Sequence, residues 1–126
     1  MARVVCIEDE PDMIELMRLL LTRQGFEVIG ARGGNEGVAL VEKNLPELIL
    51  LDIMMPDLDG WEVYDHLKKN PTTRDIPVIV VTARAQTAEK LAALDKAGVD
   101  DYIVKPFGPG QLLDSIQRVL GRKRQM

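Results

Sequence analysis

Short apolar segments alternate with helix-like segments five times along the chain, and this alternation restricts the fold more than any other feature. The apolar segments lie at 3–7, 26–30, 47–51, 76–81 and 101–104. Helical spacing or composition marks the segments at about 11–24, 33–44, 60–69, 86–98 and 108–121. The alternation predicts a parallel sheet with helices on both faces. The run IPVIVV agrees, because strands covered on both faces are apolar at every position.

The size and composition fit one domain. A chain of 126 residues can bury a core without disulfides. We assign residues 1–121 to this domain and 122–126 to a polar, basic tail. The single cysteine, Cys6, has no internal partner, which favours a cytoplasmic location, and neither a secretory signal nor a membrane span is visible. The net charge of −4 argues against nucleic-acid binding by a broad surface.

Polar side chains follow four of the predicted strands. Glu8 and Asp9 follow the first strand, Asp52 the third, Thr82 the fourth and Lys105 the fifth. The carboxyl ends of parallel strands share one edge of the sheet, where ligands bind. We therefore expect three carboxylates, one hydroxyl and one ammonium group in a single cleft, with Asp52 at a solvated rim.

Repulsion among these carboxylates requires a positive partner. Two unit charges about 4 Å apart interact by about 4 kcal/mol at an effective dielectric constant near 20. Lys105 offsets part of this repulsion, and a divalent cation would offset more. Ligand sets made only of oxygen suit Mg²⁺. A carboxylate beside Mg²⁺ and a lysine is arranged to accept a phosphoryl group, because both cations neutralise charge on the transferring oxygens.

Four stretches together resemble the receiver domain of two-component response regulators. They are VVCIEDEPD, LILLDIMMPDLDG, VIVVTAR and AGVDDYIVKPF, and the resemblance covers essentially the whole chain. It implies an α/β fold with a doubly wound five-stranded parallel sheet in the flavodoxin-like strand order 2-1-3-4-5. It also implies a phosphorelay signalling protein that catalyses only its own phosphorylation and dephosphorylation, rather than an enzyme with an external substrate.

The resemblance gives each acidic residue and the lysine a role. Asp52 would accept a phosphoryl group from a sensor histidine kinase or a phosphotransfer protein. Asp9, Asp52 and the backbone carbonyl of Met54 would ligate Mg²⁺, or Mn²⁺ in its place. Glu8 would hold the metal through water. Lys105 would pair with Asp52 before transfer and with the phosphoryl group after it.

Other residues would bind the phosphoryl group or transmit its presence. Thr82 would move to donate a hydrogen bond to a phosphoryl oxygen, and the amide of Ala83 would donate another. Tyr102 would rotate inward as Thr82 moves. The Lys105–Pro106 peptide bond would be cis. The surface of the last two helices and the fifth strand would then change and signal to a downstream protein that the sequence does not name.

Met54 and Arg84 would tune the lifetime of the phosphoryl group, because their side chains would flank the path of an attacking water. This pair of residues resembles the subgroup whose receivers precede winged-helix DNA-binding domains. That subgroup dimerises through its fourth helix, fifth strand and fifth helix.

Lys90, Asp100 and Asp101 fit the charged face of such a homodimer. Ser115 takes the place where a basic partner is expected on the last helix. The sequence therefore leaves the homodimer open.

Three other functions compete with this interpretation. A phosphatase of the haloacid dehalogenase type would carry a second aspartate at position 54, where this chain has methionine. A phosphorylation-independent interaction module would lack part of the carboxylate–lysine set, and this chain lacks none of it. A flavodoxin-like cofactor protein would need a glycine-rich phosphate loop after the first strand, where the chain is acidic.

Overall fold

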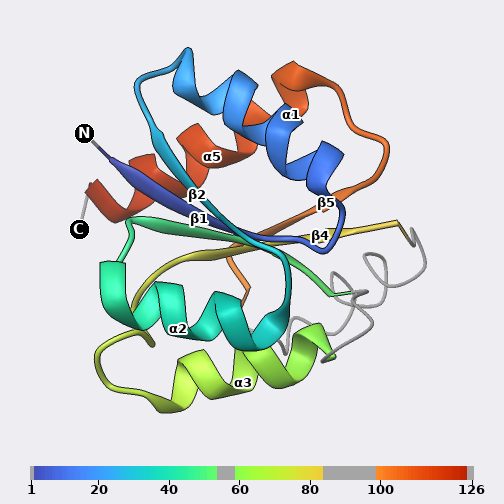
Figure 1. Ribbon diagram of the computed structural model, residues 1–126. Coiled ribbons are helices and arrows are strands. Elements are labelled where there is room, and N and C mark those ends of the chain that lie inside the picture. Colours follow the sequence, from blue (N-terminus) through green and yellow to red (C-terminus); the bar gives the residue numbers. More distant parts are fainter. Residues whose placement is uncertain (1, 54–58, 84–98, 125–126) are drawn as a thin grey trace.

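The computed structural model describes residues 2–53, 59–83 and 99–124, and Figure 1 shows their arrangement. The strands are β1 (Arg3–Ile7), β2 (Glu27–Ala31), β3 (Leu48–Asp52), β4 (Val78–Thr82) and β5 (Asp101–Val104). The helices are α1 (Pro11–Thr22), α2 (Gly34–Asn44), α3 (Gly60–Lys69) and α5 (Pro109–Arg124). The helix predicted at 86–98 lies outside the described residues.

The strands form one parallel sheet in the order β2-β1-β3-β4-β5, which confirms the predicted fold class. Helices α1 and α5 cover one face of this sheet, and α2 and α3 cover the other (Figure 1). Within the ranges that the structure describes, no helix has both the length and the apolar character that a bilayer span requires.

Alternation along each strand divides the apolar core between the two faces of the sheet. In β1, Val4 and Cys6 pack with α1 and α5, whereas Val5 and Ile7 pack with α2 and α3. All five residues of β3 and of β4 are buried. Side chains of successive strand residues point to opposite faces, so a strand covered on both faces is apolar along its length, and here only the last residues, Asp52 and Thr82, are polar.

The strand boundaries differ slightly from those predicted. Strands β3 and β4 extend to Asp52 and Thr82, so these two residues close their strands instead of following them. Strand β2 begins at Glu27, one residue later than expected. Helix α5 continues to Arg124 and so includes residues that the sequence suggested as a tail.

Helix α3 begins close to the end of β3, and two local features fix its start. The carboxylate of Asp59 accepts a hydrogen bond of 2.9 Å from the amide of Trp61, which caps the helix. Gly60 lies against Ile53, where a Cβ atom on Gly60 would be 2.3 Å from the Ile53 Cα. Only glycine allows this approach, which ties α3 to the residue that follows Asp52.

Candidate functional site

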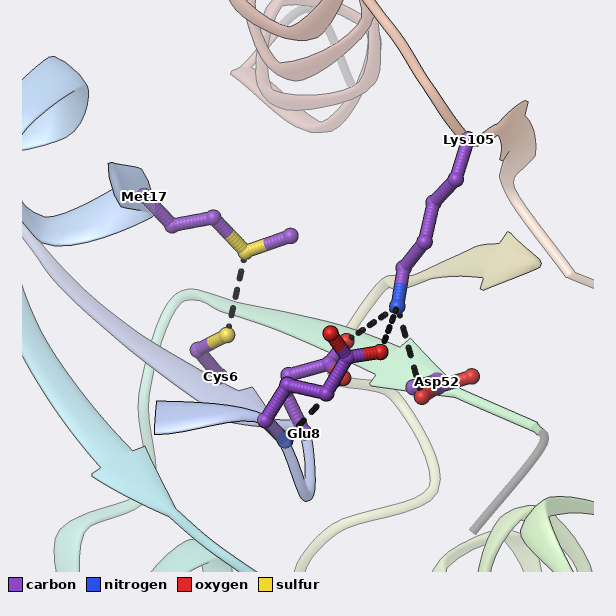
Figure 2. A network of polar contacts seen from close by, with 6 residues as sticks. Cys6, Glu8, Met17, Asp52 and Lys105 are labelled. Carbon is purple, nitrogen blue, oxygen red and sulfur yellow. Dashed lines mark hydrogen bonds and ion pairs between the residues drawn. The ribbon is translucent and has the colours of Figure 1, made fainter. Parts of the chain in front are cut away.

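Three elements bring their charged residues together at the carboxyl edge of the sheet. Glu8 follows β1, Asp52 ends β3 and Lys105 follows β5. The Lys105 ammonium lies 2.7 Å from Glu8 Oε2 and 3.5 Å from Asp52 Oδ2. Figure 2 shows the lysine side chain reaching from its own segment to the two carboxylates. Residues that are far apart in the sequence thus form one charged cluster.

This cluster is more buried than the sequence suggested. Glu8 is 1% exposed and Asp52 is 3% exposed, so the expectation of a solvated rim at Asp52 was wrong. The Lys105 side chain is 12% exposed. Buried carboxylates are costly unless a charge and hydrogen bonds compensate them. Lys105 supplies that compensation, because its ammonium lies within ion-pair distance of both carboxylates.

The cluster shifts the protonation equilibria of Glu8 and Lys105. The pKa of Glu8 is raised to about 7, because burial and, to a smaller extent, the Asp52 charge raise it more than the hydrogen bond from Lys105 lowers it. Burial alone would lower the pKa of Lys105. The hydrogen bond to Glu8 and the charges of Asp52, Glu8 and Glu10 outweigh burial, so the pKa of Lys105 is raised. The ammonium therefore stays charged at neutral pH.

Glu10 joins this cluster and was not identified from the sequence. Its carboxylate lies 4.0 Å from the Lys105 ammonium, and its amide donates a 3.3 Å hydrogen bond to Glu8 Oε1. The carboxylates of Glu8, Asp9 and Glu10 can each place an oxygen within 4.8 Å of the others. The sequence feature that could have identified Glu10 is the run of three consecutive acidic residues, Glu8, Asp9 and Glu10. Oxygen donors of this kind fit a hard divalent cation such as Mg²⁺.

The remaining predicted residues fall near this edge or outside the described chain. Thr82 is fully buried, and its carbonyl accepts a 2.8 Å hydrogen bond from the Lys105 amide. Ala83 is exposed. Tyr102 is half-buried and packs against the apolar cluster on the face of the sheet that α2 and α3 cover. The Lys105–Pro106 peptide bond is cis, as the resemblance implied. Predictions for Met54, Arg84 and Lys90 concern residues outside the described ranges.

Cys6 lies on the strand that leads into the cluster, but its chemistry is that of a packing group. Its thiol is 3.1 Å from the sulfur of Met17, and both side chains are buried (Figure 2). Burial raises the pKa of the Cys6 thiol to about 12. The thiolate is the reactive form of cysteine, so a raised pKa and a buried position both disfavour reaction at Cys6.

Curated relatives share this chain's sequence over nearly its whole length. It is 38% identical over 120 residues to the phosphate regulon transcriptional regulatory protein PhoB of Escherichia coli. This alignment covers 95% of this chain and 52% of PhoB. It is 37% identical over 122 residues to the DNA-binding dual master transcriptional regulator RpaA of Synechocystis sp., covering 97% of this chain and 50% of RpaA. The chain thus spans about half the length of these relatives.

Solved structures share the fold. A CheY-like response regulator receiver domain protein from Methanospirillum hungatei has a TM-score of 0.88 at 30% identity, covering 99% of this chain and 98% of that one. The receiver domain of a sensor histidine kinase from Pseudomonas aeruginosa has a TM-score of 0.85 at 28% identity, covering 95% and 98%. That second structure has a magnesium ion coordinated in its active-site cleft.

The match to a family covers most of the chain and includes every residue of the charged cluster. Residues 4–117 match the family described as the response regulator receiver domain. Both the sheet order and the placement of Glu8, Asp52 and Lys105 at one edge accord with this match. The chain therefore belongs to the response regulator receiver domain family of two-component systems.

Proposed function

We propose that Asp52 accepts a phosphoryl group from a sensor histidine kinase or a phosphotransfer protein in a Mg²⁺-dependent reaction. The observation that carries this proposal is the position of Lys105. Its ammonium lies 3.5 Å from Asp52 Oδ2 while it also contacts the carboxylate of Glu8. A carboxylate next to a fixed cation and further acidic residues is suited to hold both a metal ion and an incoming phosphoryl group.

In the proposed reaction, a carboxylate oxygen of Asp52 bonds to phosphorus as the phosphorus–nitrogen bond of phosphohistidine breaks. The electron pair of that bond leaves with the imidazole. Lys105 neutralises negative charge on the transferring oxygens. Glu8, Asp9, Asp52 and the carbonyl of Met54 would hold Mg²⁺, which supplies a second positive charge when bound. Burial of Glu8 and Asp52 strengthens these electrostatic effects.

The modified aspartate would bias the structure towards a second arrangement. A phosphoryl group adds about −1.5 to −2 charge and strong acceptor oxygens. Thr82 and the amide of Ala83 would donate to these oxygens, and Tyr102 would rotate inward as Thr82 moves. The surface formed by the segment before β5, by β5 and by α5 would change and signal to a downstream protein. The curated relatives are regulators about twice as long as this chain, so we propose a downstream protein partner without naming its type.

Intact-mass measurement after incubation with acetyl phosphate and Mg²⁺ tests the proposal. We expect the wild type to gain one phosphoryl mass, and Asp52→Asn or a sample treated with EDTA to gain none. Asp114→Asn serves as the matched control, because Asp114 is exposed and lies on α5, which contributes no residue to the cluster. Lys105→Ala should still bind Mg²⁺ but accept the phosphoryl group more slowly.

Three outcomes would contradict the proposal. No added mass on the wild type would favour a phosphorylation-independent interaction module. Added mass on Asp52→Asn would place the acceptor elsewhere. Steady hydrolysis of a phosphomonoester, lost in Asp52→Asn, would indicate a phosphatase.

A further inference from the structure

A groove between α2 and α3 holds the single histidine of the chain together with two carboxylates. The two helices cover the same face of the sheet (Figure 1), and the cavity between them has a volume of about 440 Å³. The α2 residues that line it follow the spacing i, i+3, i+4, i+7 of one helix face, and the two from α3 are four residues apart. The lining residues are Asn35, Val38, Ala39, Glu42, Glu62 and His66.

Glu42 and His66 face each other across this groove without forming a hydrogen bond. His66 Nε2 lies 3.9 Å from Glu42 Oε1, which exceeds the about 2.7–3.2 Å of an N–H···O hydrogen bond. Zinc bonds of about 2.0–2.2 Å to an imidazole nitrogen and a carboxylate oxygen, in tetrahedral geometry, place those two atoms about 3.4 Å apart. A closure of about 0.5 Å from the observed 3.9 Å would therefore let one ion bridge the two side chains.

Neighbouring residues orient Glu42 and supply a third donor. The side-chain amide of Asn70, the residue that ends α3, donates a 3.3 Å hydrogen bond to Glu42 Oε2, so Oε1 is left to face His66. Hydrogen bonds of this kind orient carboxylates that ligate metals. Glu62 lies one turn before His66 on α3 and is exposed. Side chains four residues apart on a helix are neighbours, so a change of rotamer brings the Glu62 carboxylate to the same ion.

We propose that Glu42, Glu62 and His66 bind one Zn²⁺ ion, with water in the remaining coordination position. One imidazole and two carboxylates suit zinc better than magnesium, which prefers ligand sets made only of oxygen. This site therefore differs in metal preference from the acidic cluster at the carboxyl edge of the sheet. Because its ligands come from two helices, the ion links α2 to α3 and binds the folded chain in preference to the unfolded one.

Calorimetric titration with ZnCl₂ tests the site. Zn²⁺ can also bind the carboxylates at the sheet edge, so the wild type is compared with His66→Gln, which should bind one Zn²⁺ ion fewer. Glu62→Gln should bind that ion about tenfold or more weakly. Asp65→Asn, which should leave the affinity unchanged, is the matched control, because Asp65 is exposed on the same helix but lies outside the lining of the groove. Equal zinc stoichiometry in wild type and His66→Gln, or equal effects of Glu62→Gln and Asp65→Asn, would overturn the proposal.

A second measurement uses the unmodified protein and does not depend on the folding of any variant. Because the chain has one histidine, its imidazole signals in nitrogen-15 NMR belong to His66. Zn²⁺ should shift these signals with the same midpoint as the calorimetric curve of the His66-dependent site, whereas Mg²⁺ at the same concentration should leave them in place. Signals that do not move at saturating Zn²⁺, or that move equally with Mg²⁺, would overturn the proposal.

Discussion

At the level of single residues, the burial of Glu8 beside Asp52 links the stability of the metal-free protein to pH. The pKa of Glu8 is raised from 4.5 to about 7, chiefly by burial. Between those values the folded protein retains a proton that the unfolded chain releases. The stabilising contribution of Glu8 is therefore complete below pH 4.5 and is lost as the pH rises through about 7.

We predict that Glu8→Gln flattens this pH dependence. Without Mg²⁺, the unfolding free energy of the wild type should fall from about pH 5 to about pH 8, and that of the variant should fall less. Lys105 does not produce this slope, because its raised pKa contributes stability that is lost only above its ordinary value of 10.5. Urea unfolding in EDTA across this range checks the prediction. Parallel curves for the two proteins would contradict it.

The identity of the site residues could be predicted from sequence better than their pairing. Glu8, Asp52 and Lys105 were found because each comes at the end of a strand in a parallel sheet. The sequence did not predict which carboxylate Lys105 contacts more closely. The 2.7 Å bond from Lys105 to Glu8 depends on the lengths and rotamers of two long side chains. Glu10 was missed for a different reason, because an exposed acidic residue at the start of a helix is common and does not by itself indicate a site.

At the level of elements, the contact between α3 and β3 depends on a glycine. A Cβ atom at Gly60 would lie 2.3 Å from the backbone Cα of Ile53. Backbone cannot yield as a flexible side chain can, so relief of this clash would have to move the start of α3 or the residue after Asp52. The packing of one helix is thereby coupled to the position of the proposed phosphoacceptor.

We predict that Gly60→Ala destabilises the protein by about 1–3 kcal/mol through this overpacking. Gly121→Ala is the matched control. Gly121 is also helical, in α5, but a Cβ atom there would meet nothing within 4 Å. Replacing it should stabilise the protein by about 0.5–1 kcal/mol, because alanine favours helix. Urea unfolding measures both changes. Equal effects of the two substitutions would show that the contact with Ile53 is unimportant.

The ends of the strands illustrate why element boundaries are harder to predict than element types. A polar side chain suggests that a strand has ended. Strand pairing is made by backbone groups, however, and it can include a residue whose side chain is polar. Asp52 pairs in register with Val81, and Thr82 pairs with Val104. The apolar pattern therefore predicted β3 and β4 correctly and placed their ends one residue early.

At the level of the whole molecule, the alternation of segments was sufficient to predict a parallel sheet covered on both faces. Each strand must cross over through a helix before it can pair in parallel with another, which leaves few possible topologies. The strand order itself came from the resemblance to receivers. The alternation of strands and helices does not predict self-association, because self-association depends on which surface charges remain available to a second copy.

The two aspartates proposed for a homodimer face are engaged within the chain. A carboxylate oxygen of Asp100 accepts a 2.9 Å hydrogen bond from the amide of Val78. The carboxylate of Asp101 accepts from the buried Ser115 hydroxyl and, at 3.1 Å, from Arg118. Buried hydrogen bonds to charged groups contribute about 1.5–3 kcal/mol each, whereas an ion pair as exposed as Asp101–Arg118 contributes about 0–1 kcal/mol. A dimer that used these aspartates would have to share or replace contacts that they already make within the chain.

We therefore predict that the protein stays monomeric when activated. A symmetric dimer needs each copy to offer both the charged group and its complement on one face. Here Asp101 already forms an ion pair with Arg118 on α5 of the same chain. Size-exclusion chromatography with light scattering, with Mg²⁺ and with or without beryllofluoride as the phosphoryl mimic, should give the monomer mass for both wild type and Asp101→Asn. A beryllofluoride-dependent dimer of the wild type that Asp101→Asn abolishes would show that Asp101 exchanges its internal partners for a second copy.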